Sequence, residues 1–131
     1  MTGESILLVE SNDNVTNKFA EALHKAGFHI SSVKWAEEAL TLIQNDNFDV
    51  ILMRTKLPGM NAFKFTQELR RDLRFRIRPL VFIYGKDDYE HKMKSFKSGA
   101  DEYLVLPFPL PELSIRLKLR LQKTIKTDSG I

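Results

Sequence analysis

Residues 49–61 read Asp49-Val-Ile-Leu-Met-Arg54-Thr-Lys-Leu-Pro58-Gly-Met-Asn61, and this stretch decides the fold. Its four apolar residues, 50–53, run without a break to the charged Arg54, and the turn signal Pro58-Gly59 follows. A short apolar run closed by turn chemistry predicts a strand buried on both faces, as in the centre of a parallel sheet. Binding sites in such sheets lie just past the carboxyl ends of the strands. The guanidinium group of Arg54 is therefore the first functional feature of the chain.

The composition predicts one ordinary domain. The chain has 131 residues, of which 43% are hydrophobic and 28% charged, enough to form a packed core. It has no cysteine, which excludes a disulfide framework, thiolate metal ligands and a cysteine nucleophile, and fits a reducing compartment. With no signal peptide and no apolar run of about 20 residues for a membrane span, we expect a cytoplasmic protein. The net charge of +3 is too small to indicate nucleic-acid binding.

Five short apolar or β-rich segments alternate with five amphipathic ones. The predicted strands cover residues 5–9, 28–33, 49–53, 79–83 and 102–106, and the predicted helices cover about 15–26, 35–44, 62–73, 88–98 and 111–126. Asn61 is predicted to cap the third helix, in which Leu69 and Leu73 face the core. Strict alternation predicts an α/β fold with one parallel sheet and helices on both faces. We expect one domain over residues 1–126 and a loose tail, 127–131, that is a free end or the start of a linker.

In such a sheet the ends of the first, third, fourth and fifth strands converge on one cleft. The residues at those ends are Glu10 with Ser11, Arg54, Tyr84 with Gly85, and Leu106. Magnesium prefers several oxygen ligands, including one or two carboxylates, and an arginine would neutralise the single glutamate of this set. No Ser/His/Asp order, histidine metal spacing or glycine-rich phosphate loop is present. We therefore expect no enzyme activity, no metal site and no cofactor, with Mg²⁺ binding weak or absent.

Three motifs follow one another along the chain. They are Ile6-Leu-Leu-Val-Glu10, then Asp49-Val-Ile-Leu-Met53 with Leu57-Pro-Gly-Met-Asn61, and Gly99-Ala-Asp-Glu-Tyr103-Leu-Val-Leu-Pro107-Phe108. Over about residues 4–124 the chain resembles the CheY-like receiver domain of bacterial two-component response regulators. The resemblance implies the flavodoxin-like (βα)5 fold, a doubly wound parallel sheet with strand order 2-1-3-4-5. It also implies a part in two-component or phosphorelay signal transduction.

The sequence departs from the receiver pattern where receivers carry their phosphotransfer chemistry. By the resemblance, Arg54 stands at the position of the phosphoacceptor aspartate. The acidic pair that holds Mg²⁺ in receivers is matched by Glu10 and Ser11, so its second carboxylate is absent. An arginine cannot accept a phosphoryl group from a phosphohistidine, and a serine is a weak Mg²⁺ ligand.

Two further receiver positions are changed near the fourth and fifth strands. Tyr84 matches the threonine or serine that senses the phosphoryl group, and Leu106 matches a lysine that pairs with it. Tyr103 is the counterpart of the switch aromatic, and Pro107 is retained. The joint changes predict a degenerate receiver, or pseudo-receiver, that has kept the fold and lost the phosphotransfer chemistry.

Each changed position has a structural interpretation beside a functional one. Arg54 is expected to pair with Glu10 and replace the metal, because a buried arginine is rarely left unpaired; the alternative is a diffusible anion bound by Arg54. Asp13 is expected to cap the first helix rather than substitute as a metal ligand. Tyr84 is expected to fill space and pack on Leu106 rather than act as a switch.

Five arginines crowd into nine residues, namely Arg70, Arg71, Arg74, Arg76 and Arg78. One interpretation is a patch for an anion, an RNA or an acidic partner. We favour the other, a solvated helix end where cations suit the helix dipole, because no nucleic-acid motif accompanies the arginines.

The resemblance also implies a face for a protein partner. Receivers of the DNA-binding type dimerise through the fourth helix, fifth strand and fifth helix with crossed ion pairs. The residues that match this pattern are Glu112 and Arg116, with Lys92 and Asp101 or Glu102 as partners. The alternative is ordinary helix surface, since exposed ion pairs contribute only about 0–1 kcal/mol each.

The leading functional prediction is a non-enzymatic, phosphorylation-independent receiver module that binds a protein partner or its own output domain. Two alternatives stay open. One is a phosphoacceptor that uses a non-standard aspartate such as Asp13 or Asp49. The other is a module that binds an anion or a nucleic acid through Arg54 or the arginines at 70–78.

Overall fold

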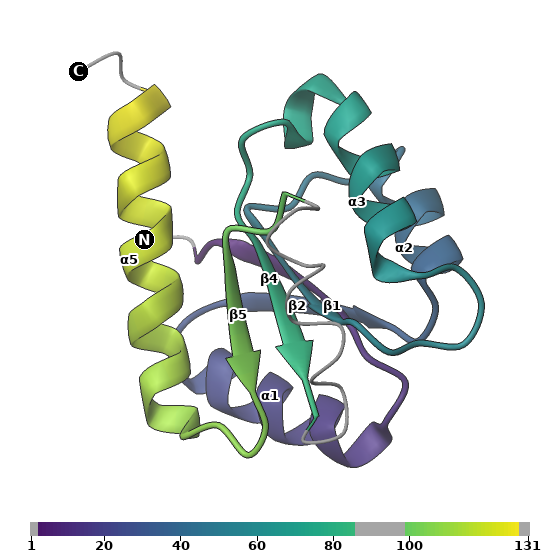
Figure 1. Cartoon of the computed structure of the whole chain (residues 1–131). Helices are drawn as coiled ribbons and strands as arrows, with labels where there is room; N and C mark the ends of the chain where they lie inside the picture. Colours follow the sequence, from purple (N-terminus) through teal and green to yellow (C-terminus); the bar gives the residue numbers. More distant parts are fainter. Residues whose placement is uncertain (1–2, 86–98, 129–131) are drawn as a thin grey trace.

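The computed structural model describes residues 3–85 and 99–128, in which the chain forms a parallel sheet of five strands (Figure 1). The strands are β1 (Ser5–Val9), β2 (His29–Val33), β3 (Val50–Arg54), β4 (Leu80–Tyr84) and β5 (Glu102–Val105). Their order is β2-β1-β3-β4-β5, and each neighbouring pair is parallel. The expected α/β flavodoxin-like fold and its strand order are confirmed.

Helices cover both faces of the sheet. They are α1 (Asp13–Lys25), α2 (Ala36–Ile43), α3 (Ala62–Arg71) and α5 (Leu110–Asp128), with a short 3₁₀ helix, η1 (Leu73–Phe75). Figure 1 shows α1 and α5 on one side of the sheet and α2 and α3 on the other. The helix expected at 88–98 lies outside the described residues. None of the helices in the described ranges is both long and apolar enough to cross a membrane.

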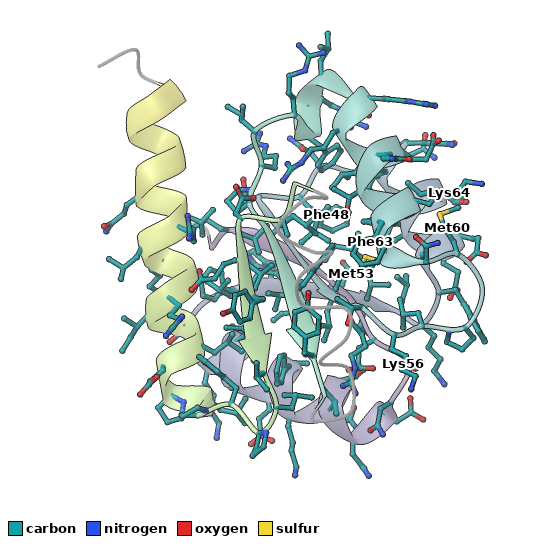
Figure 2. All side chains as sticks on the ribbon, in the orientation of Figure 1. Phe48, Met53, Lys56, Met60, Phe63 and Lys64 are labelled. Atoms are coloured by element: carbon teal, nitrogen blue, oxygen red, sulfur yellow. The ribbon has the colours of Figure 1, made fainter. Side chains whose placement is uncertain are left out.

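The strands have two buried faces because successive side chains point to opposite sides of a sheet. In β3, Ile51 and Met53 pack with α2 and α3, whereas Val50 and Leu52 pack with α1 and α5, and all four are fully buried. The prediction of a central strand buried on both faces is therefore confirmed. Figure 2 shows Phe48, Met53 and Phe63 gathered between the sheet and the α2–α3 layer, with the exposed Lys56 and Lys64 outside it.

The register of the strands places the candidate site. Val9 of β1 lies opposite Met53, and Arg54 at the end of β3 lies opposite Ile83. Because every neighbouring pair is parallel, the carboxyl ends of the strands share one edge of the sheet. The residues that follow β1, β3, β4 and β5 therefore meet there.

The helix caps confirm one prediction and correct another. Asn61 caps α3, because its Oδ1 accepts a hydrogen bond from the Lys64 amide at 2.8 Å. Asn12, not Asp13, caps α1, because its Oδ1 accepts from the amide of Val15 at 3.1 Å. Asp13 lies in the first turn of α1 and pairs with Lys34 at 3.3 Å on the surface. Asn and Asp cap helices about equally well, so two adjacent candidates cannot be ranked by residue type.

The expectation that Leu73 faces the core is wrong. Helix α3 ends at Arg71, and Leu73 is 74% exposed, while Phe75 is fully buried in its place. The cause is Asp72, whose Oδ1 accepts a hydrogen bond from the amide of Arg74 at 2.9 Å and starts η1. This local cap ends the helical spacing that the apolar pattern of 62, 65, 69 and 73 suggested.

Arg70 ties together the connection between α3 and β4. Its Nη1 donates to the carbonyls of Phe75 and Arg78 at 2.8 and 2.6 Å. Its Nη2 donates to the carbonyl of Gly99 at 2.9 Å and to the Asp101 carboxylate at 3.1 Å. One guanidinium thus joins η1, the segment before β4 and the segment before β5.

Three more arginines of the 70–78 stretch have carboxylate partners. The pairs are Arg71 with Glu68, Arg74 with Asp72, and Arg78 with Asp49. Hydrogen bonds from the side chain and the backbone amide of Arg74 lower the pKa of Asp72 below its ordinary value. The arginine stretch is therefore chiefly a set of internal contacts, which weakens both the anion-patch interpretation and that of a merely solvated helix end.

Replacing Arg70 with lysine is expected to lower the free energy of unfolding by about 2 kcal/mol, because an ammonium cannot reach acceptors in three segments and leaves carbonyls unsatisfied. The matched control is Arg71→Lys, whose exposed pair with Glu68 is worth less than about 1 kcal/mol. Urea unfolding of both variants and the wild type measures the difference. Equal stability of the two variants would show that the Arg70 contacts contribute little.

Candidate functional site

The site is built on the carboxyl edge of the sheet, and its centre is an ion pair between β3 and the end of β1. Nη1 of Arg54 lies 3.2 Å from Oε1 of Glu10. The Glu10 side chain is 1% exposed and that of Arg54 20% exposed, so the pair is largely shielded from water. The ion pair expected from the sequence is confirmed.

The other oxygen of Glu10 is also occupied. Oε2 accepts a hydrogen bond from the amide of Asn12 at 3.1 Å. The carbonyl of Glu10 accepts from the hydroxyl of Thr16 at 3.4 Å, and its amide donates to the carbonyl of Val33 at 3.0 Å. Glu10 is thus held by β2, α1 and β3 together, and its carboxylate has a fixed orientation toward Arg54.

These residues fit Mg²⁺ poorly. Both carboxylate oxygens of Glu10 have donors, the neighbouring Ser11 offers only a hydroxyl, and Arg54 brings a positive charge to the place where a cation would sit. Within residues 3–85 and 99–128 no three histidine or carboxylate side chains gather in a way that could hold a metal. A hard cation prefers several oxygen ligands with one or two carboxylates free to bind it.

Tyr84 occupies the end of β4 on the α2–α3 side. It is 2% exposed, and its ring meets that of Tyr103 edge to face, with centroids 5.9 Å apart and planes at 81°. Leu106 packs with the α1–α5 cluster on the other face, and its amide donates a hydrogen bond of 2.7 Å to the Tyr84 carbonyl. The expected packing of Tyr84 on Leu106 is therefore wrong, because the two side chains point to opposite faces.

A cleft of about 490 Å³ adjoins the ion pair, between α1 and the connection from β5 to α5. Arg54, Gly85 and Leu106 of the predicted set line it, and so do Lys18 and Phe108, which sequence reasoning did not single out. Lys18 lies three residues after Val15, an apolar position already assigned to α1, so its place near the site follows from helical spacing. The contribution of Phe108 depends on how the chain turns after β5, which no sequence pattern reveals.

The residues expected to form a partner face have partners within the chain. Glu102 accepts from Nη1 of Arg116 at 2.6 Å and from Nε of Arg120 at 3.1 Å. Asp101 accepts from the amide of Leu80 at 2.7 Å and from Arg70 at 3.1 Å.

The remaining members of this set are Glu112 and Lys92. Glu112 lies exposed in the first turn of α5, and Lys92 lies outside the described residues. Crossed pairs with a second copy stay a prediction, and the intramolecular pairs of Glu102 would compete with them.

The aspartates considered as substitute phosphoacceptors lie elsewhere. Asp49 precedes β3 at its amino end, where it accepts from the amide of Ser5 at 2.8 Å and from Arg78 at 3.4 Å. A strand of five residues separates Asp49 from the site, a length of about 16 Å. Asp13 is exposed and pairs with Lys34. Asp49 is therefore far from the Glu10–Arg54 pair, and Asp13 is engaged with Lys34 at the surface.

Comparison with known proteins points to one family. A family model for the response regulator receiver domain matches residues 6–118. The phosphate regulon transcriptional regulatory protein PhoB of Pseudomonas aeruginosa is 30% identical over 129 residues, which are 98% of this chain and 56% of PhoB. This chain spans about half the length of the curated relatives it matches.

Solved structures of similar proteins support the same family. A putative response regulator from Chloroflexus aurantiacus is 27% identical with a TM-score of 0.86, covering 92% of this chain and 98% of that one. The receiver domain of a sensor histidine kinase from P. aeruginosa is 25% identical with a TM-score of 0.85 over 92% of this chain and 98% of its own. That structure has a magnesium ion coordinated in the active-site cleft.

Replacing Arg54 with methionine is expected to lower the free energy of unfolding by about 2–3 kcal/mol, because Glu10 would stay charged and buried without its partner. Adding Glu10→Gln removes that charge, so the double variant should regain most of the loss. Urea unfolding at neutral pH gives both values. A single variant as stable as the wild type, or a double variant no better than the single one, would contradict a stabilising pair.

Proposed function

Because this chain belongs to the response regulator receiver domain family, we propose that it is a receiver that signals without being phosphorylated. The proposal is carried by the Glu10–Arg54 ion pair at the edge of the sheet where the resemblance puts the phosphoacceptor. A guanidinium group has no oxygen to which a phosphoryl group can be transferred. Arg54 therefore occupies the phosphoacceptor position without being able to act as the phosphoacceptor.

The residues around the ion pair support the same proposal. Leu106 presents an aliphatic side chain, which cannot pair with phosphate, and Ser11 supplies no carboxylate. We infer that Mg²⁺ binds weakly or not at all, since Arg54 balances the charge of Glu10 in its place. The module is non-enzymatic in this proposal, because autophosphorylation and dephosphorylation both require the missing groups.

A receiver without this chemistry acts through contacts with proteins, and we place the contact on α5 and the end of β5. Ile115 and Leu119 lie one helical turn apart on α5 and are 59% and 57% exposed, and Val105 at the end of β5 is 43% exposed. Glu112 and Arg116 flank them on the same helix. The occupant is a protein partner, the chain's own output domain or a second copy. Nucleic acid is a weaker candidate, because four of the five arginines at 70–78 have partners within the chain.

Arg54→Asp alone is not expected to restore phosphorylation, because Ser11 and Leu106 stay in place. The positive control is a fourfold variant that recreates the receiver set, Ser11→Asp, Arg54→Asp, Tyr84→Thr and Leu106→Lys, and it should be labelled. Intact-protein mass spectrometry after incubation with acetyl phosphate and Mg²⁺ detects the added phosphoryl group. Labelling of the wild type would overturn the proposal and revive a non-standard aspartate, and labelling of Arg54→Asp alone would show that the rest of the site is still competent.

Amide NMR of the wild-type chain tests the proposal without a mutation. Addition of Mg²⁺ with beryllofluoride, a phosphoryl mimic, is expected to leave the signals of Glu10, Arg54 and Tyr84 in place. The fourfold variant serves again as the control that should respond. Saturable shifts confined to these strand ends in the wild type would contradict the loss of the phosphoryl switch.

Ile115→Lys is expected to weaken self-association or partner binding through α5, because a charge in the centre of a buried apolar contact is strongly unfavourable. The matched control is Ile77→Lys, which alters a similarly exposed isoleucine in the connection that precedes β4. Sedimentation velocity over a range of concentrations compares the two variants with the wild type. If Ile77→Lys abolishes self-association and Ile115→Lys leaves it intact, the interacting face does not lie on α5.

A further inference from the structure

The cleft between α1 and the β5–α5 connection has the size and the lining of a small-molecule site. Its volume of about 490 Å³ falls within the range of about 300–1,000 Å³ typical of such sites. Most of the described residues around it are apolar, namely Val15, Phe19, Leu106, Pro107, Phe108 and Leu110. Sites for small ligands are usually lined in this way, with a few polar groups that fix the orientation of the ligand.

The apolar walls come from two elements and are held in place. Phe19 of α1 is 3% exposed and packs in the α1–α5 core, so its position is fixed. Phe108, on the opposite wall, lies with its ring centroid 5.4 Å from the guanidinium of Arg116, which Glu102 binds at 2.6 Å. A cleft formed before binding costs a ligand less ordering free energy than one that must be assembled.

The charges at the cleft favour an anion. Lys18 and Arg54 line it, and none of the described residues that line it is a carboxylate. Glu10 balances Arg54 from behind. Lys18 forms no ion pair with a described carboxylate, and it brings a positive charge to the cleft.

We propose that this cleft binds a small carboxylic acid with an apolar body. The carboxylate lies at Lys18, and the apolar body lies against Phe19, Leu106 and Phe108. An inorganic anion is the wrong ligand, because it cannot use the apolar walls and finds Nη1 of Arg54 engaged with Glu10. This site goes beyond the proposed function, and it does not depend on whether the chain is phosphorylated.

The test compares three probes on the full chain by isothermal titration calorimetry. Sodium octanoate has both the carboxylate and the apolar body, 1-octanol has only the body, and inorganic phosphate has only the charge. We expect saturable binding of octanoate with one site, weaker binding of octanol and none of phosphate. Phosphate binding as tight as that of octanoate, or no octanoate binding at all, would overturn the proposal.

Two variants locate the ligand. Lys18→Gln should weaken octanoate binding about threefold to fivefold and leave octanol binding unchanged, because an exposed charge pair is worth up to about 1 kcal/mol. The control on the same helix is Lys25→Gln, which lies outside this cleft, pairs with Glu21 and should change neither affinity. Equal effects of the two lysine variants would place the ligand elsewhere.

Leu106→Lys separates an amphipathic site from a plain anion site. The variant adds a positive charge and removes part of the apolar wall, so octanoate binding should weaken if the body of the ligand rests on Leu106. Stronger octanoate binding would mean that charge alone attracts the ligand, and the proposal would fall. The circular dichroism spectrum and the urea unfolding of each variant are measured alongside, so that a loss of fold is not taken for a loss of binding.

Discussion

The structure depends on the pairing of one buried carboxylate with one guanidinium at the carboxyl edge of the sheet. Glu10 is held among β1, β2 and α1, and a charge so shielded from water needs a partner. In a receiver with its acidic residues intact that need is met by a metal; here Arg54 meets it from the next strand. The charge of Glu10 is therefore balanced by a side chain of the chain itself.

This consequence could be predicted because two simple rules act together. Unbroken apolar runs closed by polar residues identified the strands, and strict alternation with helices required that they be parallel. Parallel strands bring their carboxyl ends to one edge of the sheet, so Glu10 and Arg54 were expected at the same edge once their strands were assigned. The strand order itself came from the resemblance of the motifs to a known family, since no periodicity in residues 5–9 or 49–53 encodes it.

The wrong predictions share a physical cause. The neighbours of a side chain depend on local backbone geometry, which the spacing of apolar and polar residues does not specify. Asn12 and Asp13 are both good caps, and the choice between them shifts the start of the helix by only one residue. Leu73 fits the helical spacing of α3, but the hydrogen bond accepted by Asp72 ends the helix first. Tyr84 and Leu106 follow adjacent strands, yet they point to opposite faces because the pleat alternates.

The arginine stretch shows why a charge has to be counted with its partners before it is given a function. Residues 70–78 carry the densest positive charge in the sequence. The guanidinium of Arg70 donates hydrogen bonds to the carbonyls of Phe75, Arg78 and Gly99. Lys18 lies in a less conspicuous stretch, forms no ion pair with a described carboxylate, and brings its positive charge to an apolar cleft. Density of charge along the chain is a property of the sequence, whereas availability of charge is a property of the fold. The less conspicuous cation is therefore the better functional candidate.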